Sequence, residues 1–453
     1  MTKPLGTATT FAPAVDVEFS GLILDARKDE SLHRQLYQHL RQRILNGELP
    51  YGTRLPATRR LARDLEVSRN TVVAAFEQLV AEGYLASRTG EGTTVAAQIV
   101  VEPQRGAGSN RDAPTMQLGE RGQALSVPIR GLRDEEALRR FQPGIPDITD
   151  FPRTTWGRLM GRRARAASDG LTGYGHPGGF APLRQSLATY LSTARGVRCA
   201  PEQVLVTTSA QASLDLAARM LTDPGQHAWM ESPGYGGARA SFSGAGLIIH
   251  PIEVDADGAC VAQLKTGAMS DQLRIGYITP SHQYPTGHTL SLQRRLDVLD
   301  WSASSQGWIL EDDYDSEFRY ANAPIAAVQG LANHSRVIYV GSFSKTLFPG
   351  LRVAYMVVPT ALANEFRQAL RQTGQEPPLV NQAALHDFIE QGYFARHIRH
   401  VRTVYSQRRT ALLKAMEEHL SSFGAPIVAD GGLQLTFALN PRHPRSSSRA
   451  SGQ

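Results

Sequence analysis

The chain has 453 residues, of which 41% are hydrophobic and 20% charged, and its formal net charge is +6. This composition is typical of a globular protein, and the length exceeds what one hydrophobic core usually serves, so we expect one small and one large domain. Residues 1–20 contain no signal-peptide core, and no run approaches the about 18 apolar residues that cross a membrane. Two isolated cysteines, Cys199 and Cys260, exclude a disulfide framework and offer no metal site. We therefore expect a cytoplasmic protein without membrane partners, whose diffuse positive charge permits DNA binding without establishing it.

Residues 31–97 show the apolar spacing of three short helices. Leucine or isoleucine recurs every four residues from Leu32 to Ile44, which predicts a first helix that ends near Asn46. Pro56 suits the first turn of a second helix. Ser68 is a suitable N-cap for a third helix, which we expect to stop near Gly83.

Two β-prone pieces follow, at 84–85 and 93–95, and the glycines between them permit a tight hairpin turn. Helix, turn, helix and hairpin in this order are typical of a winged helix-turn-helix. The polar N-terminal end of the third helix then enters the major groove. The candidates for base contacts are Arg69, Asn70 and Thr71, and those for phosphate contacts are Arg59 and Arg88. A generic three-helix bundle with a solvated basic face is the alternative.

Residues 98–140 lose this periodicity, and we interpret them as a linker with one short helical pattern at 134–141.

From residue 141 onward, helical patterns alternate with short apolar strands. The strands are expected at 204–207, 227–230, 247–250, 273–279, 308–310, 337–340 and 353–358. This alternation predicts an α/β domain with a mostly parallel sheet, whose ligands gather at the carboxyl ends of the strands.

The strand at 337–340 runs into a small-residue turn that presents Lys345. Its amine can condense with an aldehyde, and Ser342, Ser344 and Arg352 offer hydrogen-bond donors to a phosphate. Pyridoxal phosphate needs these groups. The other four lysines, Lys3, Lys28, Lys265 and Lys414, lie in segments typical of solvated helix or loop. A surface lysine that snorkels over apolar neighbours is the alternative.

Two further strand ends carry suitable groups. Ser209, Ala210 and Gln211 open a helix after the strand at 204–207, and free amides at a helix start bind phosphate. A pyridoxal ring needs a carboxylate at its ring nitrogen and a phenol near its O3′ oxygen, and Asp312 and Tyr314 suit these roles. A Mg²⁺ site is the alternative for the acidic cluster, but no phosphate-binding lysine loop accompanies it.

Residues 55–62, 67–72, 82–83 and 90–93 resemble the sequence pattern of the GntR family of bacterial regulators, with Ala57 in place of the usual serine. The later motifs resemble class I aminotransferases of fold type I. Residues 31–437 together resemble the MocR-type branch of the GntR family, in which the two domains are fused. The resemblance implies contacts with double-stranded operator DNA by Arg54, Thr58, Arg59, Ser68, Arg69, Asn70, Thr71, Arg88 and Gly90.

The same resemblance implies pyridoxal phosphate as the cofactor, with Lys345 as its internal aldimine, Asp312 at the pyridine nitrogen and Tyr314 at O3′. It implies Tyr235 as the ring-stacking aromatic and Tyr174 as a tyrosine that reaches the partner subunit's phosphate in a head-to-tail homodimer. The implied phosphate contacts are Ser209, Ala210, Gln211, Ser342, Ser344 and Arg352. No metal is implied.

The implied function is a bacterial, cytoplasmic transcription regulator, nucleoid-associated when bound to DNA, that senses an amino acid or amine by external aldimine formation. The alternatives are an active class I aminotransferase with an accessory DNA-binding domain and a regulator whose large domain only dimerises. Tyr284 stands where aminotransferases have asparagine in Asn-Pro-x-Gly. MocR-type regulators resemble the chain in this substitution, which favours a regulator.

The chain ends soon after Phe437, so we expect an aminotransferase-like domain over 141–437 with a truncated small domain, and a disordered tail over 438–453. The expected consequences are uncovered apolar faces on helices at 388–398 and 401–416, reduced stability, little transamination and a weak response to carboxylated effectors.

Overall fold

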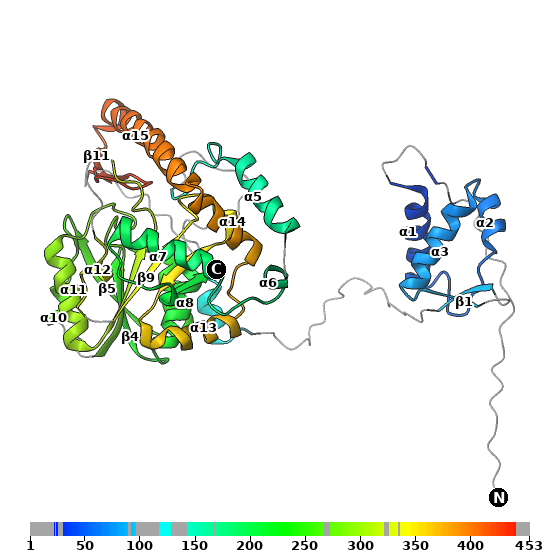
Figure 1. Ribbon diagram of the computed structural model, residues 1–453, viewed down its shortest axis with the longest axis horizontal. Coiled ribbons are helices and arrows are strands. Elements are labelled where there is room, and N and C mark those ends of the chain that lie inside the picture. Colours follow the sequence, from blue (N-terminus) through cyan, green and yellow to red (C-terminus); the bar gives the residue numbers. More distant parts are fainter. Residues whose placement is uncertain are drawn as a thin grey trace, which may run out of the picture. The chain divides into compact units, whose positions relative to one another are not determined.

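The computed structural model describes residues 22, 24–25, 30–88, 92–96, 117–127, 143–166, 169–266, 272–320, 326–333 and 336–440. The chain divides into two compact units, Met1–Met116 and Gln117–Gln453. Figure 1 shows a small helical unit with a hairpin and a larger unit in which helices cover a central sheet. No helix in the described ranges is long and apolar enough to cross a membrane.

The small unit has the predicted elements in the predicted order. These are α1 (Leu32–Leu45), α2 (Thr58–Asp64), α3 (Arg69–Ala81), β1 (Leu85–Arg88) and β2 (Gly92–Val95). The Ser68 side chain accepts a hydrogen bond from the Thr71 amide at 3.1 Å, which confirms the predicted N-cap of α3. Gly83 has a φ of +76°, a left-handed conformation that ends the helix. Leu36, Leu61 and Phe76 are buried between the helices, and β1 pairs antiparallel with β2.

The large unit is built on a sheet of eight strands in the order β3-β10-β9-β8-β7-β4-β5-β6. The strands are β3 (Val204–Thr207), β4 (His227–Ser232), β5 (Ile248–Asp255), β6 (Gly258–Ala259), β7 (Leu273–Ile278), β8 (Trp308–Asp313), β9 (Val337–Ser342) and β10 (Ala354–Val357). Strands β9, β8, β7, β4 and β5 are parallel neighbours, whereas β10 is antiparallel to β3 and β9, and β6 is antiparallel to β5. The expectation of a mostly parallel sheet is therefore confirmed.

Helices cover both faces of this sheet. They are α5 (Arg153–Arg165), α6 (Asp169–Thr172), α7 (Ala181–Arg195), α8 (Ala210–Leu221), α9 (Gly236–Gly244), α10 (Gln263–Thr266), α11 (Leu292–Ser305), α12 (Val328–Leu331), α13 (Ala363–Gln372), α14 (Leu379–Glu390) and α15 (Tyr393–Leu420). On β9, Tyr339 belongs to one core cluster, and Ile338 and Val340 belong to another. Successive strand residues point to opposite faces, so both faces are apolar and buried.

Two boundaries differ from the expectations. Helix α4 (Glu120–Leu125) lies within the segment interpreted as a linker, and its Leu125 lies against Gly244 of α9, so the large unit begins before residue 141. At the other end, β11 (Gly424–Ile427) pairs antiparallel with β12 (Thr436–Leu439), which continues past residue 437. The helical pattern at 134–141 lies largely, and the expected tail from 441 onward wholly, outside the described residues.

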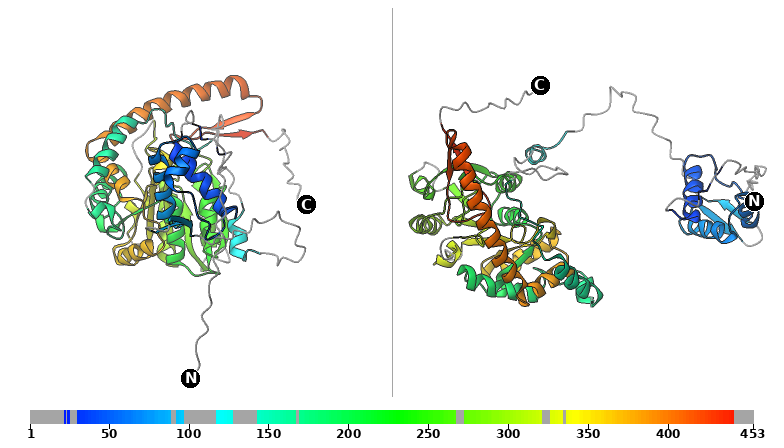
Figure 2. Two further views of the ribbon diagram at one scale, coloured as in Figure 1. Left: turned by 90° about the vertical axis from the view of Figure 1, so that its right-hand side faces the viewer. Right: turned by 90° about the horizontal axis from the view of Figure 1, so that it is seen from above.

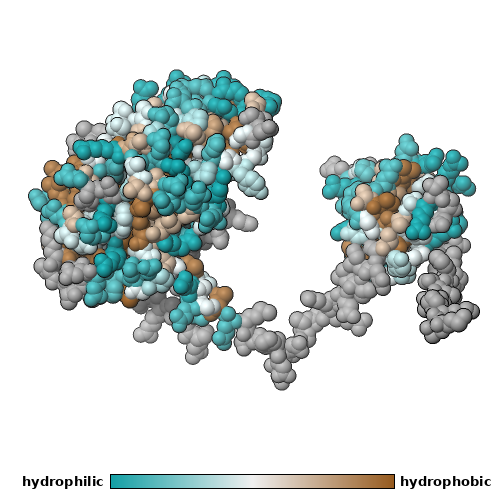
Figure 3. All heavy atoms as spheres, turned by 60° about the horizontal axis from the view of Figure 1, so that its bottom comes forward, coloured by the Kyte–Doolittle hydropathy of each residue, from teal (hydrophilic) through white to brown (hydrophobic). Residues whose placement is uncertain are grey.

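The predicted uncovered helix faces are only partly observed. Phe388, Phe394 and Ile398 are buried, because α5 and α14 cover this part of the unit, so the expectation for 388–398 is wrong. Farther along α15, side chains such as Leu412 are half-buried. Figure 2 shows this end of α15 extending beside the small β11–β12 sheet, and Figure 3 shows a mainly hydrophilic surface with scattered apolar clusters.

Candidate functional site

The candidate site lies at the carboxyl ends of the parallel neighbours β8 and β9. Asp312, near the end of β8, is in register with Val340 of β9, and Lys345 follows the end of β9 in the next turn. The charges of Asp312 and Asp315 act on the ammonium group of Lys345, which places these three side chains in one electrostatic environment. The edge of the sheet that was predicted to bind a ligand therefore brings the predicted amine and carboxylate together.

Asp312 is a buried carboxylate with one free oxygen. Its side chain is almost fully enclosed, and its Oδ2 accepts a hydrogen bond from the Tyr277 hydroxyl at 2.8 Å. Its Oδ1 has no hydrogen-bond donor among the described residues. Burial raises the pKa of Asp312 to about 7, and the nearby Asp313 and Asp315 add to this, although the bond from Tyr277 lowers it. A buried acceptor without a donor is costly, so this oxygen is suited to a cationic N–H donor of a ligand.

Lys345 is held at the site by a backbone contact. Its Nζ donates a hydrogen bond to the carbonyl oxygen of Gly144, where a Cβ atom would lie 3.1 Å from Nζ. Burial lowers the pKa of Lys345, and the carboxylates of Asp315 and Asp312 oppose this effect. A lowered pKa increases the fraction of neutral amine, which is the form that attacks a carbonyl carbon.

Three tyrosine rings line the site. Tyr284 makes edge-on contacts with Tyr235, at 5.8 Å between ring centroids, and with Tyr314, at 6.3 Å. The Tyr314 hydroxyl accepts a hydrogen bond from the amide of Gln434 at 3.3 Å. Burial raises the pKa of Tyr235 to about 12, and that of Tyr314 is also raised well above its usual value, so both phenols stay neutral. The charge of Asp312 acts on both phenols, so Tyr235 and Tyr314 lie near this carboxylate, and the Tyr284 ring lies between theirs.

The predicted phosphate-binding groups lie at two turns. Ser209 caps α8 by accepting a hydrogen bond from the Ala212 amide at 3.1 Å, which leaves Ala210 and Gln211 in the first turn of that helix. The Ser342 hydroxyl accepts a hydrogen bond from the Ser344 amide at 3.0 Å. Arg352 follows in a left-handed conformation, and its side chain is exposed.

Tyr174 lies apart from these groups. Its side chain is 96% exposed, whereas its carbonyl oxygen accepts a hydrogen bond from Arg371 at 3.0 Å. The backbone of Tyr174 is therefore anchored within the subunit while its ring is exposed, and no contact between Tyr174 and Lys345 is found among the described residues.

Sequence reasoning missed the groups that surround these residues. Tyr277, the donor to Asp312, is one apolar-looking residue of a buried strand. His282 and Asp315 are both buried and share a hydrogen bond of 2.7 Å between Nδ1 and Oδ1. Asp315 also accepts a hydrogen bond from the Leu433 amide at 3.0 Å. This pair connects the sheet edge to the chain segment before β12. In the sequence, Tyr277 is one residue of an apolar strand and His282 is one polar residue of a loop, so each is a weak signal.

The predicted DNA-contacting residues that the structure describes lie at the starts of α2 and α3 and on the hairpin, with Arg54 just before α2. The exposed ones are Arg54, Arg59, Ser68, Arg69, Asn70 and Arg88, and the half-buried ones are Thr58 and Thr71. The Ser68 hydroxyl is shared between the α3 amide and the Thr71 hydroxyl, at 2.9 Å from the latter. Arg54 lies over Gly92, where a Cβ atom would come within 3.1 Å of its guanidinium. Gly90 lies outside the described residues.

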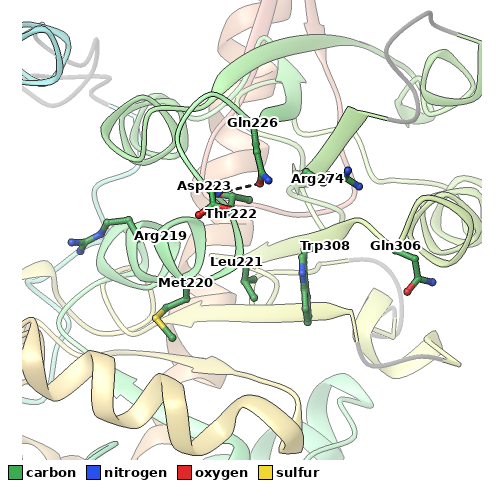
Figure 4. Close-up of a pocket in the computed structure, with 9 residues that line it drawn as sticks. All are labelled: Arg219, Met220, Leu221, Thr222, Asp223, Gln226, Arg274, Gln306 and Trp308. Carbon is green, nitrogen blue, oxygen red and sulfur yellow. Dashed lines mark hydrogen bonds between the residues drawn. The ribbon is translucent and has the colours of Figure 1, made fainter.

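A separate pocket lies at the amino-terminal ends of β7 and β8 and includes none of the predicted residues. Figure 4 shows Arg219, Arg274 and Trp308 around it. It belongs to the edge of the sheet opposite the candidate site.

Comparison with known proteins identifies both units. Residues 32–95 match the family described as bacterial regulatory proteins, gntR family, and residues 152–441 match the family of class I and II aminotransferases. The structure of LysN, an α-aminoadipate aminotransferase from Thermus thermophilus solved with N-(5′-phosphopyridoxyl)-L-leucine, is 29% identical, has a TM-score of 0.61, and overlaps 67% of this chain and 77% of that one. The kynurenine aminotransferase of Pyrococcus horikoshii, solved with PMP, is 28% identical with a TM-score of 0.60, over 64% of this chain and 72% of that one.

Relatives that match along both units are named as regulators. The probable rhizopine catabolism regulatory protein MocR of Rhizobium meliloti is 42% identical over 91% of this chain and 83% of its own length. The HTH-type transcriptional regulator TauR of Rhodobacter capsulatus is 34% identical over 89% of this chain and 82% of its own length. The chain therefore belongs to the MocR-type regulators of the GntR family, in which a winged helix-turn-helix DNA-binding domain is joined to an aminotransferase-like domain of fold type I.

Proposed function

We propose that this regulator holds pyridoxal phosphate on Lys345 and uses it to sense a primary amine or amino acid, with the response passed to operator DNA in the cytoplasm. The observation that carries the proposal is the free, buried Oδ1 atom of Asp312 in the same electrostatic environment as the Lys345 amine. A protonated pyridine nitrogen is the kind of donor that this oxygen lacks.

The other residues present fit the same group. Lys345 would hold the aldehyde carbon, Tyr314 would lie at O3′, and the first amides of α8 with Ser342 and Ser344 would hold the phosphate. When bound, pyridoxal phosphate supplies an aldehyde that reacts reversibly with primary amines. Tyr235 and Tyr284 would exclude water from one side of the ring. Relatives solved with PMP or a phosphopyridoxyl amino acid support this choice of cofactor.

We extend the proposal to a homodimer with shared sites. The Tyr174 ring is exposed, but the loop that carries it is fixed, because Arg371 binds the carbonyl oxygens of Tyr174 and Gly175 and Glu376 accepts from the Gly178 amide at 3.0 Å. A phenol that is exposed on an anchored backbone can donate a hydrogen bond to a phosphate in a second subunit.

A working aminotransferase is the second candidate, because Lys345 and Asp312 are also the groups that such an enzyme needs. The 2-aminoadipate transaminase of Thermus thermophilus is 30% identical over 64% of this chain. The higher identity to MocR, over both units, favours the regulator. Purified protein should show a visible cofactor band that shifts with a sensed amine but little turnover of amino donor with keto acid. Turnover like that of a dedicated aminotransferase would promote the second candidate.

Replacement of Asp312 by asparagine should weaken cofactor binding about 10- to 100-fold, because an amide cannot hold the ring nitrogen protonated as a carboxylate does. In the wild type, the pKa of Asp312 is raised to about 7 and that of Lys345 is lowered. Binding of a cation favours the ionised carboxylate, and attack on the aldehyde requires the neutral amine. Affinity should therefore rise as the pH increases from about 6 to about 8.

Fluorescence titration of cofactor-free protein measures both effects. The asparagine variant should lose the part of the pH dependence that ionisation of Asp312 causes. An affinity that is unchanged by the substitution, or that falls as the pH rises, would contradict the role given to Asp312.

Replacement of Arg69 by alanine should reduce discrimination between operator and random DNA by about 1 to 3 kcal/mol, because base contacts carry the sequence specificity. Replacement of Arg88 should weaken binding to both DNAs about equally, because phosphate contacts carry none. Competition binding assays with the two duplexes measure the difference. Equal losses on both duplexes for the Arg69 variant would move Arg69 to the phosphate-contacting class.

A further inference from the structure

The outer surface formed by α5 and the first turns of α15 is strongly basic. Helix α5 has five arginines and no acidic residue. Helix α15 has five arginines and one lysine before its first acidic residue, Glu417. Both helices lie on the outside of the large unit in Figures 1 and 2. We give the name arginine surface to five of the exposed arginines, namely Arg158, Arg162, Arg165, Arg396 and Arg399.

These arginines form one continuous surface. Arg158 donates a hydrogen bond to the Tyr393 hydroxyl at 2.9 Å, and the guanidinium of Arg396 lies 5.7 Å from the centroid of the same ring. Tyr393 at the start of α15 therefore connects the two helices. Arg162 lies four residues after Arg158, and Arg165 lies three residues after Arg162, so the three side chains share one side of α5.

Few carboxylates neutralise this charge. Asp387 of α14 pairs with Arg162 and Arg163, each at 2.6 Å. Beside α15, Asp150 pairs with His400 at 3.4 Å, and Asp147 pairs with Arg408. Among the side chains that the structure describes, no carboxylate forms an ion pair with Arg158, Arg165, Arg396 or Arg399. Positive charges that lie close together repel one another and lower the stability of the folded unit. An anionic partner would remove this repulsion, so the surface is suited to bind one.

We infer that the arginine surface is a second DNA-binding surface, which contacts the phosphate backbone of duplex outside the segment that the winged helix reads. Guanidinium groups bind phosphate through paired N–H donors. Helix α5 is about 20 Å long, which corresponds to about six base pairs of duplex. The chain already carries a DNA-binding domain, so DNA held by that domain is present near the large unit at high effective concentration. This inference rests on the family membership and not on the proposed cofactor role.

The test compares two full-length double variants that remove the same charge. Arg158→Gln/Arg165→Gln alters the arginine surface and keeps the pairs of Arg162 and Arg163 with Asp387. Arg219→Gln/Arg274→Gln alters the pocket in Figure 4, where neither arginine was assigned a DNA contact. The probe is a fluorescent, random-sequence duplex of about 60 base pairs. This length leaves room for winged helices that bind two half-sites. It also exceeds the upper limit of about 70 Å that the chain geometry sets on the reach of residues 97–116.

The readout is the slope of the logarithm of the binding constant against the logarithm of the NaCl concentration. This slope is negative for DNA binding. In Arg158→Gln/Arg165→Gln, its magnitude should decrease by about 0.9 for each phosphate that the variant no longer neutralises, whereas in Arg219→Gln/Arg274→Gln it should stay at the wild-type value. Tryptophan fluorescence melting and light scattering check folding and oligomeric state. Equal slopes in all three proteins would overturn the inference, as would equal decreases in both variants. An unchanged slope with a loss of oligomer would overturn it too and would instead assign the surface to a contact between subunits.

Discussion

Replacement of Lys345 by alanine should abolish covalent attachment of pyridoxal phosphate. Lys345 lies beside Asp312 and Asp315, and burial lowers its pKa. Without its amine, Asp312 and the phosphate-binding turns could still hold the cofactor by hydrogen bonds and charge, but borohydride reduction would leave no pyridoxyl group on the protein. Mass spectrometry of the reduced, digested protein measures this directly, and the visible cofactor band of the unreduced protein should be lost as well.

Replacement of Lys414 by alanine is the matched control. Its side chain is exposed on α15 and lies 3.8 Å from Glu418, a surface pair of little energetic value. This variant should keep the pyridoxyl group on the peptide that contains Lys345. Both variants should bind random DNA like the wild type, because the winged helix has its own core. A pyridoxyl group found on another lysine of the wild type would overturn the assignment.

Replacement of Arg195 by leucine should destabilise the large unit by about 3 to 5 kcal/mol. Arg195, at the end of α7, is buried and lies 3.3 Å from both Asp313 and Glu317. Tyr339 donates to Asp313 at 2.5 Å, and Tyr190 donates to Glu317 at 2.7 Å. The leucine side chain would leave two buried carboxylates without a cation, and neighbouring phenols cannot neutralise them.

Urea unfolding followed by tryptophan fluorescence measures this loss. All four tryptophans, Trp156, Trp229, Trp301 and Trp308, belong to the large unit, so the signal reports on that unit alone. The exposed Arg198 supplies the control, because its replacement by leucine should change stability by no more than about 0.5 kcal/mol. Equal stabilities of the two variants would contradict the structural role of the buried network.

The main parts of the candidate site were predictable from the sequence because they follow strands. A strand leaves a strong local pattern, and parallel strands bring their carboxyl ends to one edge, so Lys345 and Asp312 could be expected to lie together. Ser68 was predictable for a similar reason, since an N-cap depends on residues within one turn. These features need only local sequence and one rule of topology.

The remaining parts depend on contacts between distant segments. Tyr277 and Asp312 are 35 residues apart, and His282 and Asp315 are 33 residues apart, so neither pair leaves a local pattern. The sequence did not predict helix α4, because it has only six residues and one strongly apolar side chain, at its end, so it is too short to show a helical period. The burial of Phe388 and Ile398 was missed because the covering helix α5 is far away in the sequence and itself rich in arginine.

The central claim is that an amine alters DNA binding through the cofactor on Lys345. The most direct test is titration of a panel of primary amines against a fluorescent DNA fragment that the purified protein selects from genomic DNA, with wild type and Lys345→Ala in parallel. We expect an amine that shifts the cofactor band of the wild type to change its DNA affinity also, and to leave the affinity of the alanine variant unchanged. The same change of affinity in both proteins would contradict the claim.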